Sequence, residues 1–131
     1  GLSRLKLVNL INPIEVQEML PAVAQGAIGI EQISENEEIK NFLFPIHDKN
    51  TEMQLLVERS FLAELDGSCR TPIGGLAKTI DGRIVFFGEI LKPDGSQIFK
   101  GQWTGNLSEA ESIGKEAGQI LKEKGGDGFF K

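Results

Sequence analysis

The chain has 131 residues, of which 40% are hydrophobic and 25% are charged, a composition typical of one folded domain or a little more. Its 14 basic and 19 acidic residues give a formal net charge of -5, which argues against nucleic acid or anionic lipid as a partner. The longest apolar runs are far shorter than the roughly 18 residues that span a bilayer, and the first residues do not resemble a secretion signal. We therefore expect a soluble protein of the cytoplasm or of an organelle lumen.

Cys69 is the only cysteine and His47 the only histidine. A single cysteine excludes an internal disulfide bond and a cysteine-rich zinc site, and one histidine does not complete a metal centre. The chain begins with Gly1 and already follows an apolar pattern from Leu2 onward. We therefore expect it to be part of a longer protein.

The first 50 residues show weak signals for secondary structure. Residues 1–14 carry apolar side chains at mixed spacing, which predicts a short helix or an extended segment. Residues 27–31 predict a buried strand. Gln25-Gly26 precedes that strand, where glycine permits a close backbone approach and the glutamine amide offers a donor and an acceptor. Apolar residues spaced along 39–46, after an acidic run, predict a short surface helix.

Stronger signals follow from residue 51 onward. Thr51 and Gln54 have the spacing of a capping box, and apolar residues three or four apart predict a helix from about Glu52 to Leu65, ended by Asp66-Gly67. Three β segments then alternate with turn residues. They cover residues 76–80, 84–92 and 97–104, with turns at Asp81-Gly82 and Pro93-Asp94-Gly95.

The last predicted helix opens with a second capping box, from Ser108 to Glu111, and ends at Gly125-Gly126. Residues 51–126 thus predict a two-layer α+β unit of order α-β-β-β-α, with both helices on one face of a three-stranded antiparallel sheet. The preceding residues are too few to form a similar core by themselves.

Cys69 lies in the predicted loop between the first long helix and the sheet. An inert, buried cysteine is the ordinary interpretation of a lone thiol. The flanking Gly67 and Ser68 and the cation of Arg70 favour a reactive thiol instead, because the cation stabilises a thiolate. The negative end of the preceding helix dipole opposes that effect, and the sequence leaves both interpretations open.

Two long motifs resemble the porphobilinogen deaminase (hydroxymethylbilane synthase) family. The family pattern E-R-x-F-L-x-x-L-x-G-x-C-x-x-P-I-x-G is matched by Glu58 to Gly75, and L-P-A-V-x-Q-G-A-x-G-I-E by Leu20 to Glu31. A weaker block, G-L-x-R-L, matches Gly1 to Leu5. The resemblance covers essentially the whole chain.

The resemblance implies a specific chemistry. Members of the family join four porphobilinogen molecules into hydroxymethylbilane, releasing ammonia at each step, on a dipyrromethane primer bound to one cysteine through a thioether. By motif this cysteine is Cys69. By motif also, Gln25 and Gly26 line the cofactor cleft, and Arg4 contacts the acid groups of the pyrroles. A soft sulfur nucleophile suits an electron-poor methylene, and a covalent tether makes each later addition effectively intramolecular.

The chain also departs from the family pattern. Nothing in it corresponds to the family's first domain, which carries the catalytic aspartate. We therefore expect residues 1–50 to be a remnant of the second and first domains and residues 51–131 to be the cofactor-attachment domain. Alone, the chain is expected to be inactive towards porphobilinogen. We also expect residues 1–50 to expose apolar surface that drives a non-native dimer. The family resemblance places the intact enzyme in the cytoplasm, or in the plastid stroma of a plant.

Two other functions fit the same element order. Double-stranded RNA-binding domains also have the order α-β-β-β-α, but the last helix here opens with Glu109 and Glu111, which repel phosphate. A small interaction domain with a structural or redox-active Cys69 is the second alternative. The mass of the intact protein separates this alternative from the porphobilinogen deaminase interpretation, because a dipyrromethane adduct adds a few hundred daltons.

Overall fold

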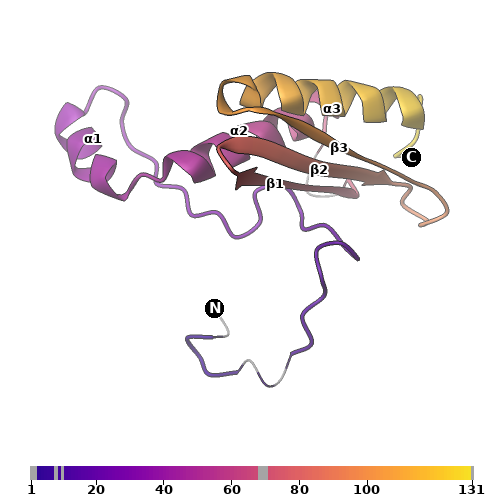
Figure 1. The fold of residues 1–131 in the computed structure, drawn as a ribbon, viewed down its shortest axis with the longest axis horizontal. Coiled ribbons are helices and arrows are strands. Elements are labelled where there is room, and N and C mark those ends of the chain that lie inside the picture. Colours follow the sequence, from indigo (N-terminus) through magenta and orange to yellow (C-terminus); the bar gives the residue numbers. More distant parts are fainter. Residues whose placement is uncertain (1–2, 8, 10, 68–70, 131) are drawn as a thin grey trace.

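The computed structural model describes residues 3–7, 9, 11–67 and 71–130. Its helices and strands follow one another in the order α1, η2, α2, β1, β2, β3, η3 and α3 (Figure 1). Their bounds are α1 Glu37–Leu43, η2 Phe44–Ile46, α2 Lys49–Glu64, β1 Ile73–Ile80, β2 Arg83–Leu91, β3 Ile98–Asn106, η3 Leu107–Glu109 and α3 Ala110–Gly125. The order from α2 to α3 confirms the predicted α+β class.

The three strands form an antiparallel sheet in the order β1-β2-β3. Ile80 pairs with Arg83, so the β1–β2 hairpin turns on Asp81-Gly82, whose φ angles of 49° and 73° suit a tight two-residue turn. Leu91 pairs with Ile98 across the turn that contains Pro93-Asp94-Gly95. Both predicted turns are confirmed, and β2 and β3 begin and end within two residues of the predicted bounds.

β1 begins at Ile73, three residues before the predicted start. Gly74 and Gly75 therefore lie inside the strand, where they pair with Glu89 and Gly88 of β2. Glycines weaken a strand signal in a sequence because they contribute no side chain to the sheet. Here β2 supplies the pairing that holds them in the extended conformation.

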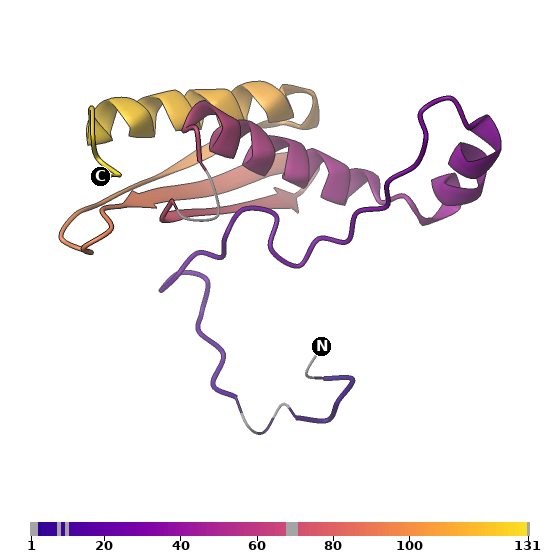
Figure 2. The ribbon, with the colours of Figure 1, turned by 180° about the vertical axis from the view of Figure 1, so that it is seen from behind.

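Both long helices cover the same face of the sheet, as Figure 2 shows from behind, and this arrangement was also predicted. Phe61 of α2 packs edge-to-face on Phe86 of β2, with 5.0 Å between ring centroids. A Cβ at Gly114 of α3 would overlap the carbonyl oxygen of Val57, so this glycine permits the close approach of α2 and α3. The buried core consists of Val57, Phe61, Leu65, Ile73, Ala77, Ile84, Phe86, Ile90, Ala110, Ile113, Ala117, Leu121 and Phe129.

The helix N-termini differ from the predicted capping boxes. α2 starts before Thr51, and the carboxylate of Asp48 accepts a hydrogen bond of 2.7 Å from the Thr51 N–H. α3 is preceded by η3, and the capping box joins Asn106 and Glu109. In both cases a carboxylate or amide earlier in the chain takes the place of the predicted hydroxyl cap. The predicted end of α3 at Gly125-Gly126 is confirmed.

The described residues before α1 form no α-helix, and the predicted strand at residues 27–31 is wrong. Ile28 is 93% exposed and Ile30 57% exposed. No strand in the described part of the chain lies beside this segment to pair with its backbone, and an unpaired strand is not stable in water. The predicted extended segment or short helix at residues 1–14 contains a turn closed by the Lys6 N–H and the Ser3 carbonyl.

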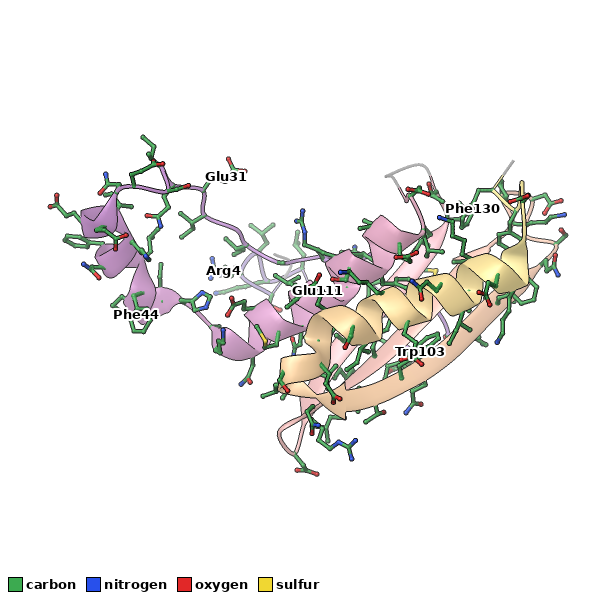
Figure 3. All side chains as sticks on the ribbon, turned by 90° about the horizontal axis from the view of Figure 1, so that it is seen from above. Arg4, Glu31, Phe44, Trp103, Glu111 and Phe130 are labelled. Atoms are coloured by element: carbon green, nitrogen blue, oxygen red, sulfur yellow. The ribbon has the colours of Figure 1, made fainter. Side chains whose placement is uncertain are left out.

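α1 confirms the predicted short surface helix, with Glu37 and Glu38 in its first turn and the Asn36 side chain as its N-cap. Figure 3 shows Phe44 beside this helix, at the opposite end of the molecule from Phe130. Phe42 and Phe44 are each 76% exposed. The region before α2 therefore presents apolar side chains that the core does not cover, as the sequence predicted.

Candidate functional site

The loop between α2 and β1 contains Cys69, which lies outside the described residues together with Ser68 and Arg70. The residues that enter this loop, 65–67, continue from the end of α2 and are called its first stem. Asp66 takes a left-handed conformation with a φ of 52°, and the Gly67 N–H donates to the Leu62 carbonyl at 3.0 Å. Lys122 of α3 holds this stem by donating to the Glu64 carbonyl and to the Asp66 carboxylate.

The second stem, Thr71-Pro72, leads directly into β1 of the sheet. The Ile73 N–H donates to the Thr71 carbonyl at 2.9 Å, and the Leu91 N–H donates to the Pro72 carbonyl at 3.0 Å. Both ends of the loop are therefore tied to the helix and sheet layers. Such a loop on a rigid scaffold suits a residue that must present its side chain to a ligand.

Residues 20–24 run along the outer edge of β1. The Gly75 N–H donates to the Pro21 carbonyl at 3.0 Å, and Ala22 forms an isolated β-bridge with Gly74. A Cβ on Gly74 would lie 2.9 Å from the Leu20 Cβ, and one on Gly75 would lie 3.1 Å from a Val23 methyl group. The paired glycines therefore allow the segment before Gln25-Gly26 to lie against the strand that follows Cys69.

Gln25 and Gly26 form an exposed turn at the end of this segment. The Gln25 side-chain oxygen accepts from the Ala22 N–H at 3.1 Å, and its backbone N–H donates to the Ala22 carbonyl. No described residue accepts from the Gln25 side-chain amide nitrogen. Gly26 has a φ of 83° and no atom within 4 Å of an added Cβ, so the turn has open space beside it.

Arg4 is not brought to this turn. It is exposed, and no hydrogen bond or ion pair joins it to another described residue. Residues 3–7, which include Arg4, lie apart from the sheet in Figures 1 and 2. Of the four predicted site residues, the structure thus describes Gln25 and Gly26 near β1 and Arg4 away from it, and Cys69 lies outside the described residues.

Glu58 is a buried carboxylate at this site that sequence reasoning did not single out. Its side chain lies between α2, β1 and the segment before Gln25, and it is 5% exposed. The sequence does carry a signal for this buried position. Glu58 precedes Phe61, Leu62 and Leu65 by three, four and seven residues, so it falls on the apolar stripe of the helix. A charged residue on a buried stripe has a specific partner in most proteins.

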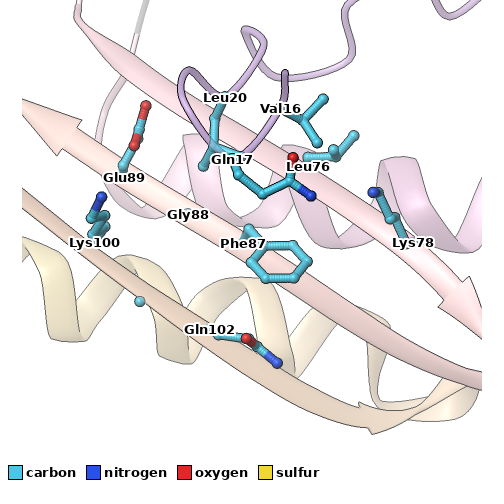
Figure 4. Close-up of a pocket in the computed structure, with 11 residues that line it drawn as sticks. Val16, Gln17, Leu20, Leu76, Lys78, Phe87, Gly88, Glu89, Lys100 and Gln102 are labelled. Atoms are coloured by element: carbon cyan, nitrogen blue, oxygen red, sulfur yellow. The ribbon is translucent and has the colours of Figure 1, made fainter.

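A hollow of about 390 Å³ lies on the sheet face opposite the helices (Figure 4). Leu76 and Phe87 supply apolar surface from the strands, and Lys78 and Lys100 stand at its sides. Gln17 reaches over it from the segment before Leu20. Arg4, Gln25 and Gly26, the predicted site residues that the structure describes, do not line this hollow.

Neither a metal centre nor a membrane-spanning helix is present among the described residues. They contain no group of three or more histidine, cysteine, aspartate or glutamate side chains that could hold a metal ion. None of the described helices is both long and apolar enough to cross a bilayer.

The chain belongs to the porphobilinogen deaminase family. The family model described as "Porphobilinogen deaminase, C-terminal domain" matches residues 53–123, and the one described as "Porphobilinogen deaminase, dipyromethane cofactor binding domain" matches residues 1–41. Cys69 falls within the first match, and Arg4, Gln25 and Gly26 fall within the second.

Similar proteins come from bacteria and plants. The porphobilinogen deaminase of Nitrobacter hamburgensis is 46% identical over 131 residues, a match that covers 99% of this chain and 42% of the relative. That of Paracoccus denitrificans is 38% identical, also over 42% of its length. The chloroplastic porphobilinogen deaminase of Pisum sativum is 40% identical, over 36% of its length. The chain thus spans about two fifths of the length of these relatives.

Proposed function

We propose that this chain is the C-terminal part of an enzyme that joins four porphobilinogen molecules into hydroxymethylbilane on a cysteine-bound dipyrromethane. The observation that carries the proposal is the contact between the two family motifs. Residues 20–24 lie against β1, so the turn at Gln25-Gly26 is held on the strand that follows the Cys69 loop. Two motifs that are far apart in the sequence thus lie in contact, which supports the proposal that they serve one site.

In this proposal Cys69 attaches the dipyrromethane through a thioether. The thiolate displaces ammonia at an aminomethyl carbon, with formation of the C–S bond and cleavage of the C–N bond. When bound, the dipyrromethane supplies the pyrrole carbon to which the next porphobilinogen is joined. The tether keeps the growing chain on the enzyme, so only the next porphobilinogen has to bind before each addition.

The Gln25-Gly26 turn fits a pyrrole that carries carboxylates. The Gln25 side-chain nitrogen has no acceptor among the described residues, so it can donate to an acid group. The open space beside Gly26 admits a flat ring close to the backbone. Arg4 is proposed to bind the same acid groups in the whole protein, where other domains bring it to the cleft.

We further propose that residues 1–50 belong to the domains that precede the cofactor-attachment domain, residues 51–131. Their exposed apolar side chains support this division. Without those domains, the chain is proposed to be inactive and to form a non-native dimer through the same surface. Its location is proposed to be the cytoplasm, or the plastid stroma in a plant, as the chloroplastic name of the pea relative supports.

Two measurements test the function. In the full-length enzyme, intact mass and a peptide map should locate a dipyrromethane adduct of a few hundred daltons on Cys69, and Cys69→Ser should abolish both the adduct and turnover. An active Cys69→Ser enzyme would refute the assignment. In the second measurement, the 131-residue chain is incubated with porphobilinogen and assayed for uroporphyrinogen. Turnover comparable to that of the intact enzyme would contradict the proposed inactivity.

The alternative of a small interaction domain with a structural cysteine predicts a different result. In that case Cys69 in the full-length protein carries no adduct, and neither the wild type nor Cys69→Ser turns over porphobilinogen. The same two measurements therefore separate the two interpretations.

A further inference from the structure

Glu58 joins two segments that lie far apart in the sequence. Its Oε2 accepts a hydrogen bond of 2.7 Å from the Ala24 N–H, and its Oε1 accepts one of 2.8 Å from the Ala77 N–H. One carboxylate of α2 thus binds both the residue before Gln25 and the middle of β1.

The bond to Ala77 completes a regular pattern along the outer edge of β1. Alternate N–H groups of an edge strand point away from the sheet and need partners. Here the Gly75 N–H donates to the Pro21 carbonyl, and the Ala77 N–H donates to Glu58. Residues 21–24 and Glu58 therefore cover this edge together.

A buried carboxylate is costly, and packing alone does not require one at this position. Burial raises the pKa of Glu58, and the two backbone N–H donors oppose that rise by stabilising the charged form. No described residue forms an ion pair with it. The two amides are therefore its principal compensation in the described part of the chain.

The bond to Ala24 also fixes a strained turn. Ala24 has a φ of 59°, a left-handed conformation that costs energy for a residue with a Cβ. Its N–H points at Glu58, and the next two residues are Gln25 and Gly26. Loss of this hydrogen bond would free Ala24 to return to an ordinary conformation and would reorient the turn.

We propose that Glu58 is a positioning residue that fixes the Gln25-Gly26 turn on the domain that carries Cys69. The role of the turn rests on the proposed function, but the hydrogen bond between Glu58 and Ala24 in the turn does not. Glu58 touches neither substrate nor cofactor in this proposal. It acts through the Ala24 backbone.

Hydrogen exchange in the 131-residue chain tests the hydrogen bond between Glu58 and Ala24 directly. In Glu58→Gln only one side-chain oxygen remains, so the side-chain NH2 group faces one of the two backbone N–H groups. We expect exchange to become faster at both the Ala24 and the Ala77 amide, because one loses its acceptor and the other keeps only a neutral oxygen. The larger of the two rises should be about tenfold or more. Amides of β2 such as Phe86, which pair within the sheet, should keep their rates.

Glu52→Gln is the matched control. It makes the same change on the same helix, but Glu52 pairs with Lys49 and His47 on the surface and does not contact β1. It should leave both amides unchanged. Unchanged exchange of Ala24 in Glu58→Gln would overturn the proposal. An equal rise at Ala24, Ala77 and Phe86 would also overturn it, because that result shows a loss of global stability only.

The full-length enzyme provides the functional readout. Glu58→Gln should slow the addition of porphobilinogen units to the Cys69 adduct, followed by mass, by about tenfold, whereas Glu52→Gln should not. A normal rate in Glu58→Gln would overturn the positioning role. Absence of any adduct on wild-type Cys69 would instead count against the proposed function, and the exchange rates would still decide whether Glu58 holds the turn.

Discussion

Lys122 Nζ lies 2.9 Å from Asp66 Oδ2 and 3.0 Å from the carbonyl oxygen of Glu64. The last turns of α3 thus bind the end of α2, where unpaired carbonyl groups carry partial negative charge. The hydrogen bond to Asp66 raises the pKa of Lys122, so the ammonium form is the one that this contact favours. The residues that lead to Cys69 are thus held by a side chain that lies 56 residues after Asp66 in the sequence.

Removing this contact should loosen the stem without unfolding the domain. In Lys122→Met we expect faster exchange of the Gly67 amide, which donates to the Leu62 carbonyl, and unchanged exchange at Phe86. The fall in Tm should be small, because both partners are exposed to solvent. Lys124→Met, in the same helical turn but without a contact to Asp66, is the control. Equal exchange at Gly67 in the two variants would contradict the prediction.

The approach of α2 to α3 depends on Gly114. In Gly114→Ala the new methyl group overlaps the Val57 carbonyl oxygen and lies close to the Ser60 Cβ, so the helices must separate. Helix propensity favours alanine by about 1 kcal/mol, but overpacking against backbone outweighs this gain. We expect a net loss of about 2 kcal/mol in the free energy of unfolding, measured by chemical denaturation.

Gly29→Ala is the control for that substitution. Gly29 has no atom within 4 Å of an added Cβ, so the same methyl group meets open space. We expect a change in unfolding free energy of less than about 0.5 kcal/mol. A Gly114→Ala protein as stable as Gly29→Ala would show that the two helices can repack freely.

The order of elements from α2 to α3 could be predicted because each signal there is local. Asp81-Gly82 identifies a tight turn from two residues, and the apolar stripe that contains Val57 and Phe61 identifies a helix face. The same local reasoning was wrong for the caps. It selected Thr51 because the hydroxyl fits a motif, whereas the stronger acceptor Asp48 lies three residues earlier.

Features that depend on distant residues were beyond local reasoning. Ile28 and Ile30 have strand-forming side chains, but a strand also needs a neighbour, and the described residues supply none for them. Gly74 fell outside the predicted strand, and its actual role depends on Leu20 passing close to β1. The buried position of Glu58 likewise follows from two segments that the sequence does not connect.

The stability of the chain should depend on pH through Glu58. Burial raises its pKa in the folded state above the unfolded value of about 4.5. Its contribution is therefore fully present below the unfolded pKa and is lost as the pH rises through the folded pKa. We expect the unfolding free energy of wild type, measured relative to Glu58→Gln, to decrease from pH 4 to pH 7.

The comparison with Glu58→Gln is needed because other carboxylates act in the opposite direction. Hydrogen bonds from Thr51 lower the pKa of Asp48, and a hydrogen bond from Lys115 lowers the pKa of Glu111. Their contributions are lost as the pH falls, in both proteins alike. If the difference in unfolding free energy between the two proteins stays constant or grows with pH, then Glu58 ionises at least as easily in the folded state as in the unfolded state.

The apolar surface before α2 should make the isolated chain self-associate. Phe42 and Phe44 are each 76% exposed, and Ile28, Ile30 and Ile46 are exposed in the same region of the chain. Ile28, Ile30, Phe44 and Ile46 line one hollow, and exposed apolar surface of this kind favours burial against a second copy. Sedimentation equilibrium should therefore give a mass above the 14.3 kDa of one chain.

Replacing both phenylalanines by serine should weaken this association because the substitution removes apolar area from the contact and leaves the core untouched. About 25 cal/mol is lost for each Å² of apolar surface that is no longer buried, so two aromatic rings have a large effect on a small interface. Ile98→Ser is the control, since Ile98 is an exposed apolar residue of β3 outside this region. Association that persists in Phe42→Ser/Phe44→Ser, or that Ile98→Ser weakens equally, would place the contact elsewhere on the chain.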